Sequence, residues 1–378
     1  MLALGDAATD VPADLAPPAG DDGVPLDPGE CFASSPFTIE PRAPGRLRLP
    51  ALARADDEVL VVTTRETDDS STVVARPLTP VGAVDGDSVT LGAGRGGTVV
   101  PFTLGWTEPG FTVAYQDDAA TLAAGRLSLD GTLVGASSTG RASSSVRPLL
   151  VFTPSLAVNG WVDGGVPSAF VVRLPGGEPV DLDLPGVGMD GAQDTEAPDA
   201  FRVVSVGATG VVVQRWSIAG EALSREDVPL RWTGTFPTAV HRAVLLDDEP
   251  SALAVFAGTV RALDDGIVEA RVDAADGDWF FGDSTLWSGD AAVDPRTRWL
   301  GLAVAVLDWG GPETGVRFLG LHPRGDTINV PVSGPVEVAG PIEVAIVDTG
   351  LASPSFLVVW VENAAAGGRV RAATIGCD

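Results

Sequence analysis

Lysine is absent from this sequence of 378 residues, and histidine and cysteine occur only twice each. A chain without lysine cannot form a Schiff base or use a lysine as general base. Its 51 acidic residues outnumber its 24 basic ones, and the formal net charge of −27 argues against nucleic-acid binding through phosphate contacts. We therefore predict no nucleic-acid partner. Apolar runs are far shorter than a membrane span, so we also predict no transmembrane segment.

Known catalytic motifs are missing as well. The sequence contains no GxSxG, HExxH, P-loop, GxGxxG or CxxC pattern. The two histidines, His241 and His322, belong to different predicted segments, so we do not expect them to share a metal ion. A catalytic role is therefore less expected than a binding role.

The two cysteines lie near the two ends of the sequence, at Cys31 and Cys377. One interpretation is a pair of unrelated free thiols, as is usual in the cytosol. The other, which we favour, is a single disulfide that joins the ends and needs an oxidising compartment. The disulfide would place the protein outside the cytoplasm.

Residues 1–30 are rich in Ala, Asp and Pro, with no apolar periodicity and no basic residue. Such a segment cannot bury enough surface to offset the entropy of ordering, so we predict a disordered tether. No signal peptide is recognisable ahead of it. The tether resembles the segment that follows the acylated cysteine of bacterial lipoproteins, although that cysteine is missing here.

Beyond the tether, short β-rich runs are separated by Gly, Pro and Asp, and one unit recurs seven times. The unit has an apolar strand, a polar turn and a second strand that usually carries Arg. Those second-strand positions are Arg76, Arg126, Arg173, Arg215, Arg271, Gly320 and Arg371. The spacing of about 50 residues is that of one four-stranded blade. We therefore predict an all-β fold, a seven-bladed β-propeller over residues 31–378.

The copies resemble the blades of secreted bacterial seven-bladed propellers, which often read VVWxD followed by aRhsxxG. The last copy, SFLVVWVENAAAGGRVRAATIG, matches this pattern best at Trp360 and Arg371. This copy ends early, so we expect residues 36–40 to pair beside residues 369–375 and complete its blade. That pairing would bring Cys31 next to Cys377.

Acidic residues recur in the turn between the two strands of the unit, so one face of the ring should carry many carboxylates. The predicted acidic face consists of Glu66, Asp117, Asp163, Asp264, Asp308 and Glu362. It could bind Ca²⁺ or a cationic partner. The alternative, which we favour, is that these residues serve solubility and turn formation.

Two smaller groups are weaker candidates for binding. The loop DAADGDWFFGD holds Asp273, Asp276, Asp278 and Asp283, a candidate Ca²⁺ site without the final Glu of an EF-hand. Trp287 and Trp309 could form an aromatic platform for a sugar. The alternative for the acidic loop is an ordinary turn, which is commoner than a Ca²⁺ site. The alternative for the two tryptophans is packing between blades, which is commoner than sugar binding.

The sequence therefore predicts a non-catalytic, extracytoplasmic binding or scaffold protein of bacterial type, whose partner is a protein or a polysaccharide. We expect a monomer unless partners assemble it, and no cofactor other than the candidate Ca²⁺. The alternatives are a carbohydrate-active hydrolase or lyase with two channel carboxylates, and a Ca²⁺-dependent adhesin.

Overall fold

The computed structural model describes about three quarters of the chain, and the structural statements below concern this part. The described residues are 30–55, 57–95, 102–107, 110–116, 121–142, 149–152, 156–163, 166–173, 180–193, 197, 200–207, 210–217, 219–228, 238–245, 253–260, 267–274, 277–280, 284–308, 314–321, 327–334, 336 and 342–377. The predicted tether lies outside them, apart from its last residue.

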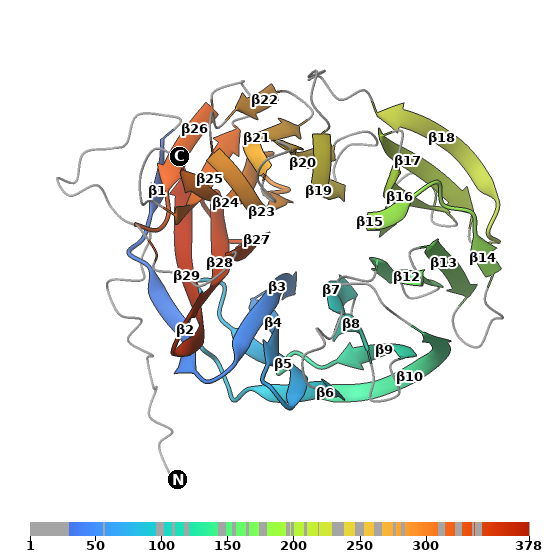
Figure 1. Ribbon diagram of the computed structural model, residues 1–378, viewed down its shortest axis with the longest axis horizontal. Coiled ribbons are helices and arrows are strands. Elements are labelled where there is room, and N and C mark those ends of the chain that lie inside the picture. The colour runs from blue at the N-terminus through green and yellow to red at the C-terminus, as the bar shows by residue number, and fades with distance from the viewer. Residues whose placement is uncertain are drawn as a thin grey trace, which may run out of the picture.

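The described strands form seven antiparallel sheets that surround a common centre (Figure 1). Six sheets are four-stranded and follow the chain in order. The first three contain β3 (Arg46–Ala55), β4 (Glu58–Glu66), β5 (Ser70–Leu78) and β6 (Val89–Arg95); β7 (Phe102–Thr107), β8 (Gly110–Gln116), β9 (Thr121–Leu127) and β10 (Leu133–Ala142); and β11 (Leu149–Phe152), β12 (Leu156–Asp163), β13 (Val166–Arg173) and β14 (Val180–Leu182).

The next three sheets repeat the same order. They contain β15 (Val187–Gln193), β16 (Ala200–Gly207), β17 (Gly210–Ser217) and β18 (Ala222–Val228); β19 (Thr238–Leu245), β20 (Leu253–Val260), β21 (Ile267–Ala274) and β22 (Gly277–Phe280); and β23 (Ser284–Val293), β24 (Leu300–Asp308), β25 (Thr314–Leu321) and β26 (Thr327–Pro331).

The seventh sheet, which we call the closing sheet, joins the two ends of the chain. It contains β27 (Glu343–Asp348), β28 (Ser355–Ala364) and β29 (Gly367–Cys377), and β29 also pairs with β1 (Cys31–Ala33) and β2 (Phe37–Ala43). Phe37 lies opposite Ala372 and Cys31 opposite Cys377, so residues 36–40 pair beside β29 as the sequence predicted.

The first strands of successive sheets line the centre and contact one another. These contacts run from β3 to β7, β11, β15, β19, β23 and β27, and β27 contacts β3 again. Side chains help to join them: Asp190 on β15 accepts a hydrogen bond from the backbone N–H of Leu245 (2.8 Å), and Asp290 on β23 accepts one from Ile346 (3.2 Å). The exposed backbone edge of a first strand is thus satisfied by its neighbour.

Strand formation follows the local sequence. In β5 the apolar residues alternate with partly exposed ones, which is the pattern of a strand with one buried face. In β28, SFLVVWVENA, nearly every residue is buried, because this strand lies between two neighbours of its sheet and between two sheets. Leu357 and Val359 pack against Val59 and Val61 of β4, which joins the closing sheet to the first sheet.

The disulfide predicted from the sequence is present. Cys31 and Cys377 are bonded, their Cα atoms lie 4.1 Å apart, and both residues are buried beside Trp299 and Phe318. The bond spans 346 positions of the sequence and connects the first described strand to the last. No helix in the described residues is long and apolar enough to cross a membrane.

Candidate functional site

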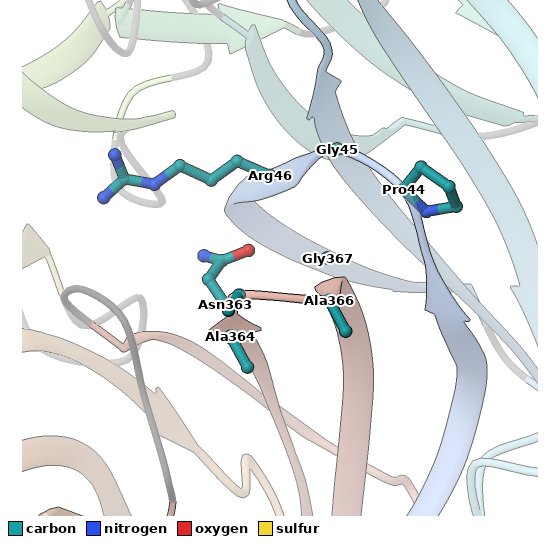
Figure 2. A pocket seen from close by; sticks show the side chains of 8 residues that line it. Pro44, Gly45, Arg46, Asn363, Ala364, Ala366 and Gly367 are labelled. Atoms are coloured by element: carbon teal, nitrogen blue, oxygen red, sulfur yellow. The ribbon is translucent and has the colours of Figure 1, made fainter.

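A pocket of about 370 Å³ lies where the turn between β2 and β3 meets the turn between β28 and β29 (Figure 2). The ends of the ring meet at this place. The pocket is lined by Pro44, Gly45, Arg46, Asn363, Ala364, Ala365, Ala366 and Gly367. Its walls are therefore backbone and small apolar side chains, with Arg46 and Asn363 as the polar side chains.

The two turns approach closely enough to require glycine. Gly367 has a φ of 110°, and a Cβ on it would collide with the carbonyl oxygen of Ala43. The N–H of the next residue, Gly368, donates a hydrogen bond of 2.8 Å to the carbonyl of Gly45. The pocket rim is thus held by direct backbone contact between the two ends of the chain.

Asn363 fixes the start of β3 against the closing sheet. Its side-chain Oδ1 accepts a hydrogen bond from the N–H of Leu47 (2.8 Å), and its Nδ2 donates one to the carbonyl of Leu47 (2.8 Å). The carboxamide thus replaces a strand neighbour for this buried residue. Both hydrogen bonds hold Leu47, and Asn363 keeps one N–H and one oxygen lone pair beside them.

Glu362 precedes this asparagine and is the more deeply buried of the two residues of the predicted acidic face whose side chains are described. Its side chain is 2 % exposed and lies in an ion pair with Arg369, which stands opposite it in the hairpin. The indole Nε1 of Trp360 donates a second hydrogen bond to it, of 2.8 Å. Glu362 is therefore part of a buried charge network.

Two further glutamates near the pocket are paired in the same way. Glu66, the other residue of the predicted acidic face whose side chain is described, has its Oε2 3.2 Å from the Nε of Arg48. Glu40 pairs with Arg65, which also donates to the carbonyl of Pro44 (3.1 Å). Burial lowers the pKa of Arg65, and the nearby charge of Arg76 lowers it further.

Two arginines beside the pocket have no carboxylate partner in the described part of the chain. Arg42 donates a hydrogen bond of 3.2 Å to the carbonyl of Gly367. The side chain of Arg46 makes no hydrogen bond or ion pair with any described residue, and Figure 2 shows it extending from the turn on the side opposite to Pro44. Arg46 is therefore a charged side chain of the pocket lining that has no partner in the described part of the chain.

The rest of the predicted acidic face is placed only in part. Asp163 and Asp308 are the last residues of β12 and β24, and Asp117 and Asp264 lie outside the described residues. The common acidic face remains a prediction for these four positions. Glu66 and Glu362, the two whose side chains are described, form ion pairs with arginines.

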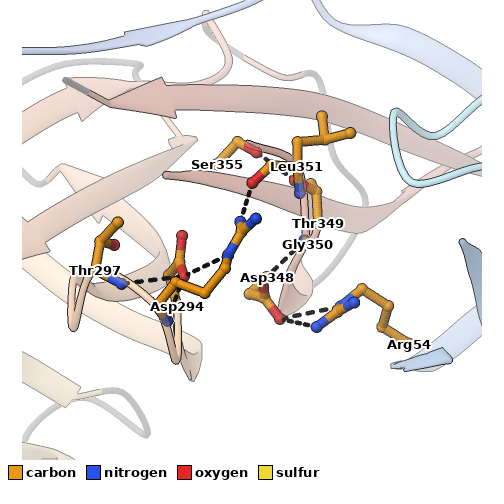
Figure 3. Close-up of polar contacts among 9 residues, drawn as sticks. Arg54, Asp294, Thr297, Asp348, Thr349, Gly350, Leu351 and Ser355 are labelled. Atoms are coloured by element: carbon orange, nitrogen blue, oxygen red, sulfur yellow. Dashed lines mark hydrogen bonds and ion pairs between the residues drawn. The ribbon is translucent and has the colours of Figure 1, made fainter. Parts of the chain in front are cut away.

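A second set of acids lies at the far ends of the first strands (Figure 3). Asp348, the last residue of β27, is bonded to the Nε (3.0 Å) and NH2 (2.9 Å) of Arg54 on β3. Asp294, directly after β23, is fully buried, and its Oδ1 accepts a hydrogen bond from the N–H of Arg296 (2.9 Å). These two acids cap the turns out of neighbouring first strands.

This second set was not predicted from the sequence, because the predicted acidic face was placed in the turn between the two strands of the repeat unit. A signal was present, since an acid also stands directly after β3, β7 and β15, at Asp56, Glu108 and Asp194. Nearby, burial raises the pKa of Glu58, and the charges of Asp85 and Asp57 raise it further.

The candidate metal and aromatic groups are mostly undescribed. Asp273 and Asp278 lie opposite each other on β21 and β22, while Asp276 and Asp283 fall outside the described residues, so the Ca²⁺ site remains a prediction. Within the described ranges, no three His, Cys, Asp or Glu residues are grouped to hold a metal ion. Trp287 is the extra residue of a β-bulge in β23, and Trp309 is outside the described part.

Comparison with known proteins identifies the fold. No protein-family model matches the sequence, and no curated protein matches it either. The structure is similar to the WD40 domain of coronin from Toxoplasma gondii, with a TM-score of 0.54 and 10% identity over 94% of this chain and 88% of that one. It is also similar to a protein of unknown function from Dyadobacter fermentans, with a TM-score of 0.50 and 10% identity over 92% of this chain and 99% of that one.

These similarities and the ring of sheets define a β-propeller, which confirms the predicted all-β fold class. At 10% identity the likeness concerns the fold alone.

Proposed function

We propose that this protein is a non-catalytic, seven-bladed propeller that binds or scaffolds a protein or polysaccharide partner outside the cytoplasm. Each of the seven sheets would be one blade. The closed circle of contacts among the seven first strands supports this arrangement. The protein would resemble the secreted, lipoprotein-like propellers of bacteria.

The observation that carries the proposal is the closure of the ring. The first strand pairs with the last and is covalently joined to it, so the two ends cannot separate locally. Both faces of the ring then present their turns on a scaffold held by buried hydrogen bonds such as those of Asn363. Rigid display of surface turns favours binding, because little entropy is lost when a partner docks.

The proposed compartment rests on the disulfide. Stable disulfides form in oxidising surroundings and are rare in the cytosol of most organisms. The sulfur atoms of Cys31 and Cys377 are buried, which is expected of a structural bond.

Two other functions compete with this proposal. A hydrolase or lyase acting on carbohydrate would need a pair of carboxylates at the centre, about 5–10 Å apart. Asp294 and Asp348 lie at the ends of neighbouring first strands, and Arg54 engages Asp348. The Oδ1 of Asp294 accepts from two backbone N–H groups and pairs with Arg296, whereas its buried Oδ2 has no hydrogen-bond partner among the described residues. A Ca²⁺-dependent adhesin would draw on the acidic residues, and its melting temperature should rise with Ca²⁺ and fall with a chelator.

One experiment separates binding from catalysis. The purified protein is run through gels that contain individual acidic or neutral polysaccharides, and the same mixtures are assayed for new reducing ends and for unsaturated products. Retardation without product formation is the expected result for a glycan-binding propeller. If new reducing ends or unsaturated products accumulate with time, the protein is an enzyme and the proposal is wrong.

A further inference from the structure

We propose that the pocket at the ring closure binds the carboxylate group of a small ligand, with Arg46 as its anchor. This inference deepens the proposed binding function, on which it rests, by naming the chemistry of one site. The pocket lies between two turns from opposite ends of the chain, so it exists only in the closed ring.

The pairing of the charged side chains around the pocket singles out Arg46. Three glutamates near the pocket each form an ion pair with an arginine. The pairs are Glu40 with Arg65, Glu66 with Arg48 and Glu362 with Arg369. Three of the arginines near the pocket are thus paired with carboxylates, whereas no carboxylate in the described part of the chain pairs with Arg42 or Arg46.

Arg42 and Arg46 differ in whether their hydrogen-bond donors are already used. Arg42 already donates to the carbonyl of Gly367, a residue of the pocket wall. Arg46 is half-buried, lines the pocket directly and has no partner among the described residues. A half-buried guanidinium with all its donors free is a strong site for a carboxylate, because it can form two parallel hydrogen bonds.

The size and lining of the pocket limit the ligand. A volume of about 370 Å³ is near the lower end for ligand pockets and holds on the order of ten water molecules. The walls formed by Pro44 and by Ala364 to Ala366 are small and apolar, and Asn363 keeps one N–H and one oxygen lone pair beside its two hydrogen bonds to Leu47. A ligand of this size has one acidic group for Arg46 and an uncharged remainder, as in a uronic acid residue or an acylated acidic amino acid.

Binding is measured by ligand-observed NMR and calorimetry on the full chain. The probes are galacturonate and N-acetylglutamate as carboxylates from two sources, and galactose as the neutral match to the first. We expect a carboxylate probe to bind with a dissociation constant in the millimolar range, as a single charge-assisted contact allows, and galactose not to bind. Which carboxylate binds more tightly distinguishes a glycan source from a peptide source.

Two variants test the anchor. Arg46→Gln should weaken carboxylate binding at least about tenfold, and Arg46→Lys should retain part of it because it keeps the charge without the planar fork. Both should fold normally, since the side chain of Arg46 bonds to no described residue and its backbone pairing with β4 is unchanged by substitution. Arg225→Gln is the matched control, because it removes an exposed arginine of β18 and should leave binding unchanged.

The inference is overturned if neither carboxylate binds the wild-type protein, or if Arg46→Gln binds them as well as the wild type does. Its failure is distinct from failure of the proposed function. A partner retained equally by the wild type and Arg46→Gln would reject the pocket and keep the binding propeller. Product formation from a polysaccharide would reject the binding propeller whatever Arg46 does.

Discussion

Single charged residues decide much of the chemistry where the ends of this ring meet. Glu362 illustrates the point, since its position beside a turn resembles that of an exposed acid, yet its side chain is 2 % exposed. A buried carboxylate persists because partners replace its hydration, here Arg369 and the indole of Trp360. Its role is therefore to hold the hairpin rather than to offer a free charge.

At this scale we predict that Glu362→Gln destabilises the protein by about 1–3 kcal/mol, because Arg369 loses its counterion while remaining two-thirds covered. Chemical denaturation of both proteins measures the difference. The matched control is Asp227→Asn, which breaks the exposed pair with Arg225 and should change stability by less than about 0.5 kcal/mol. Equal effects of the two substitutions would show that burial does not strengthen the Glu362 pair.

Among the turns and strands, β28 and β3 are linked by hydrogen bonds from the side chain of Asn363 to the backbone of Leu47. The turn from Ala364 to Gly367 brings Asn363 onto the backbone of Leu47, 316 positions away in sequence. Strand β3 belongs to the first sheet and β28 to the closing sheet, so this one side chain joins two sheets. The same turn supplies half of the pocket wall.

We therefore expect Asn363→Ala to destabilise the protein by about 2 kcal/mol or more, because the buried N–H and carbonyl of Leu47 lose their partners together. Thermal melting and hydrogen exchange at Leu47 measure the effect. Asn329→Ala, at an exposed site on β26, is the control and should be near neutral. Unchanged protection of the Leu47 amide would contradict the assigned role of Asn363.

The whole molecule depends on how its ends are joined. Without the contact of β1 and β2 with β29, the closing sheet would present an open edge, and open edges invite pairing with other chains. The disulfide adds a covalent constraint that acts mainly on the unfolded chain, which loses entropy when its ends are tied.

For this bond we predict that Cys31→Ser, Cys377→Ser and the double variant all lower the melting temperature to a similar extent. The upper limit of the loss is about 6 kcal/mol for a loop that spans 346 positions, and strain and residual unfolded structure make the measured loss smaller. Calorimetry under non-reducing conditions measures it, and intact mass with and without alkylation verifies the bond. Two alkylatable thiols in the native protein would contradict both the pairing and the proposed compartment.

Much of this fold was predictable because its signals are local or compositional. Strand patterns such as that of β5, the turns rich in Gly and Asp, and the repeat marked by Arg76 to Arg371 all lie within short stretches of the chain. The pairing of Cys31 with Cys377 followed from there being two cysteines at the two ends. The partner of Glu362 was also within reach, since the hairpin register places Arg369 opposite it.

The sequence by itself determined an all-β repeat whose ends could be joined, because alternation, turn residues and cysteine positions act over short distances or by number alone. Only the tertiary structure decided which charged side chains pair with one another, that Asn363 binds Leu47, and that Arg46 lines a pocket without a side-chain partner among the described residues. These contacts link residues up to 316 positions apart, and they depend on how neighbouring sheets are placed around the ring. No local pattern encodes that placement, because it emerges only when all the sheets pack together.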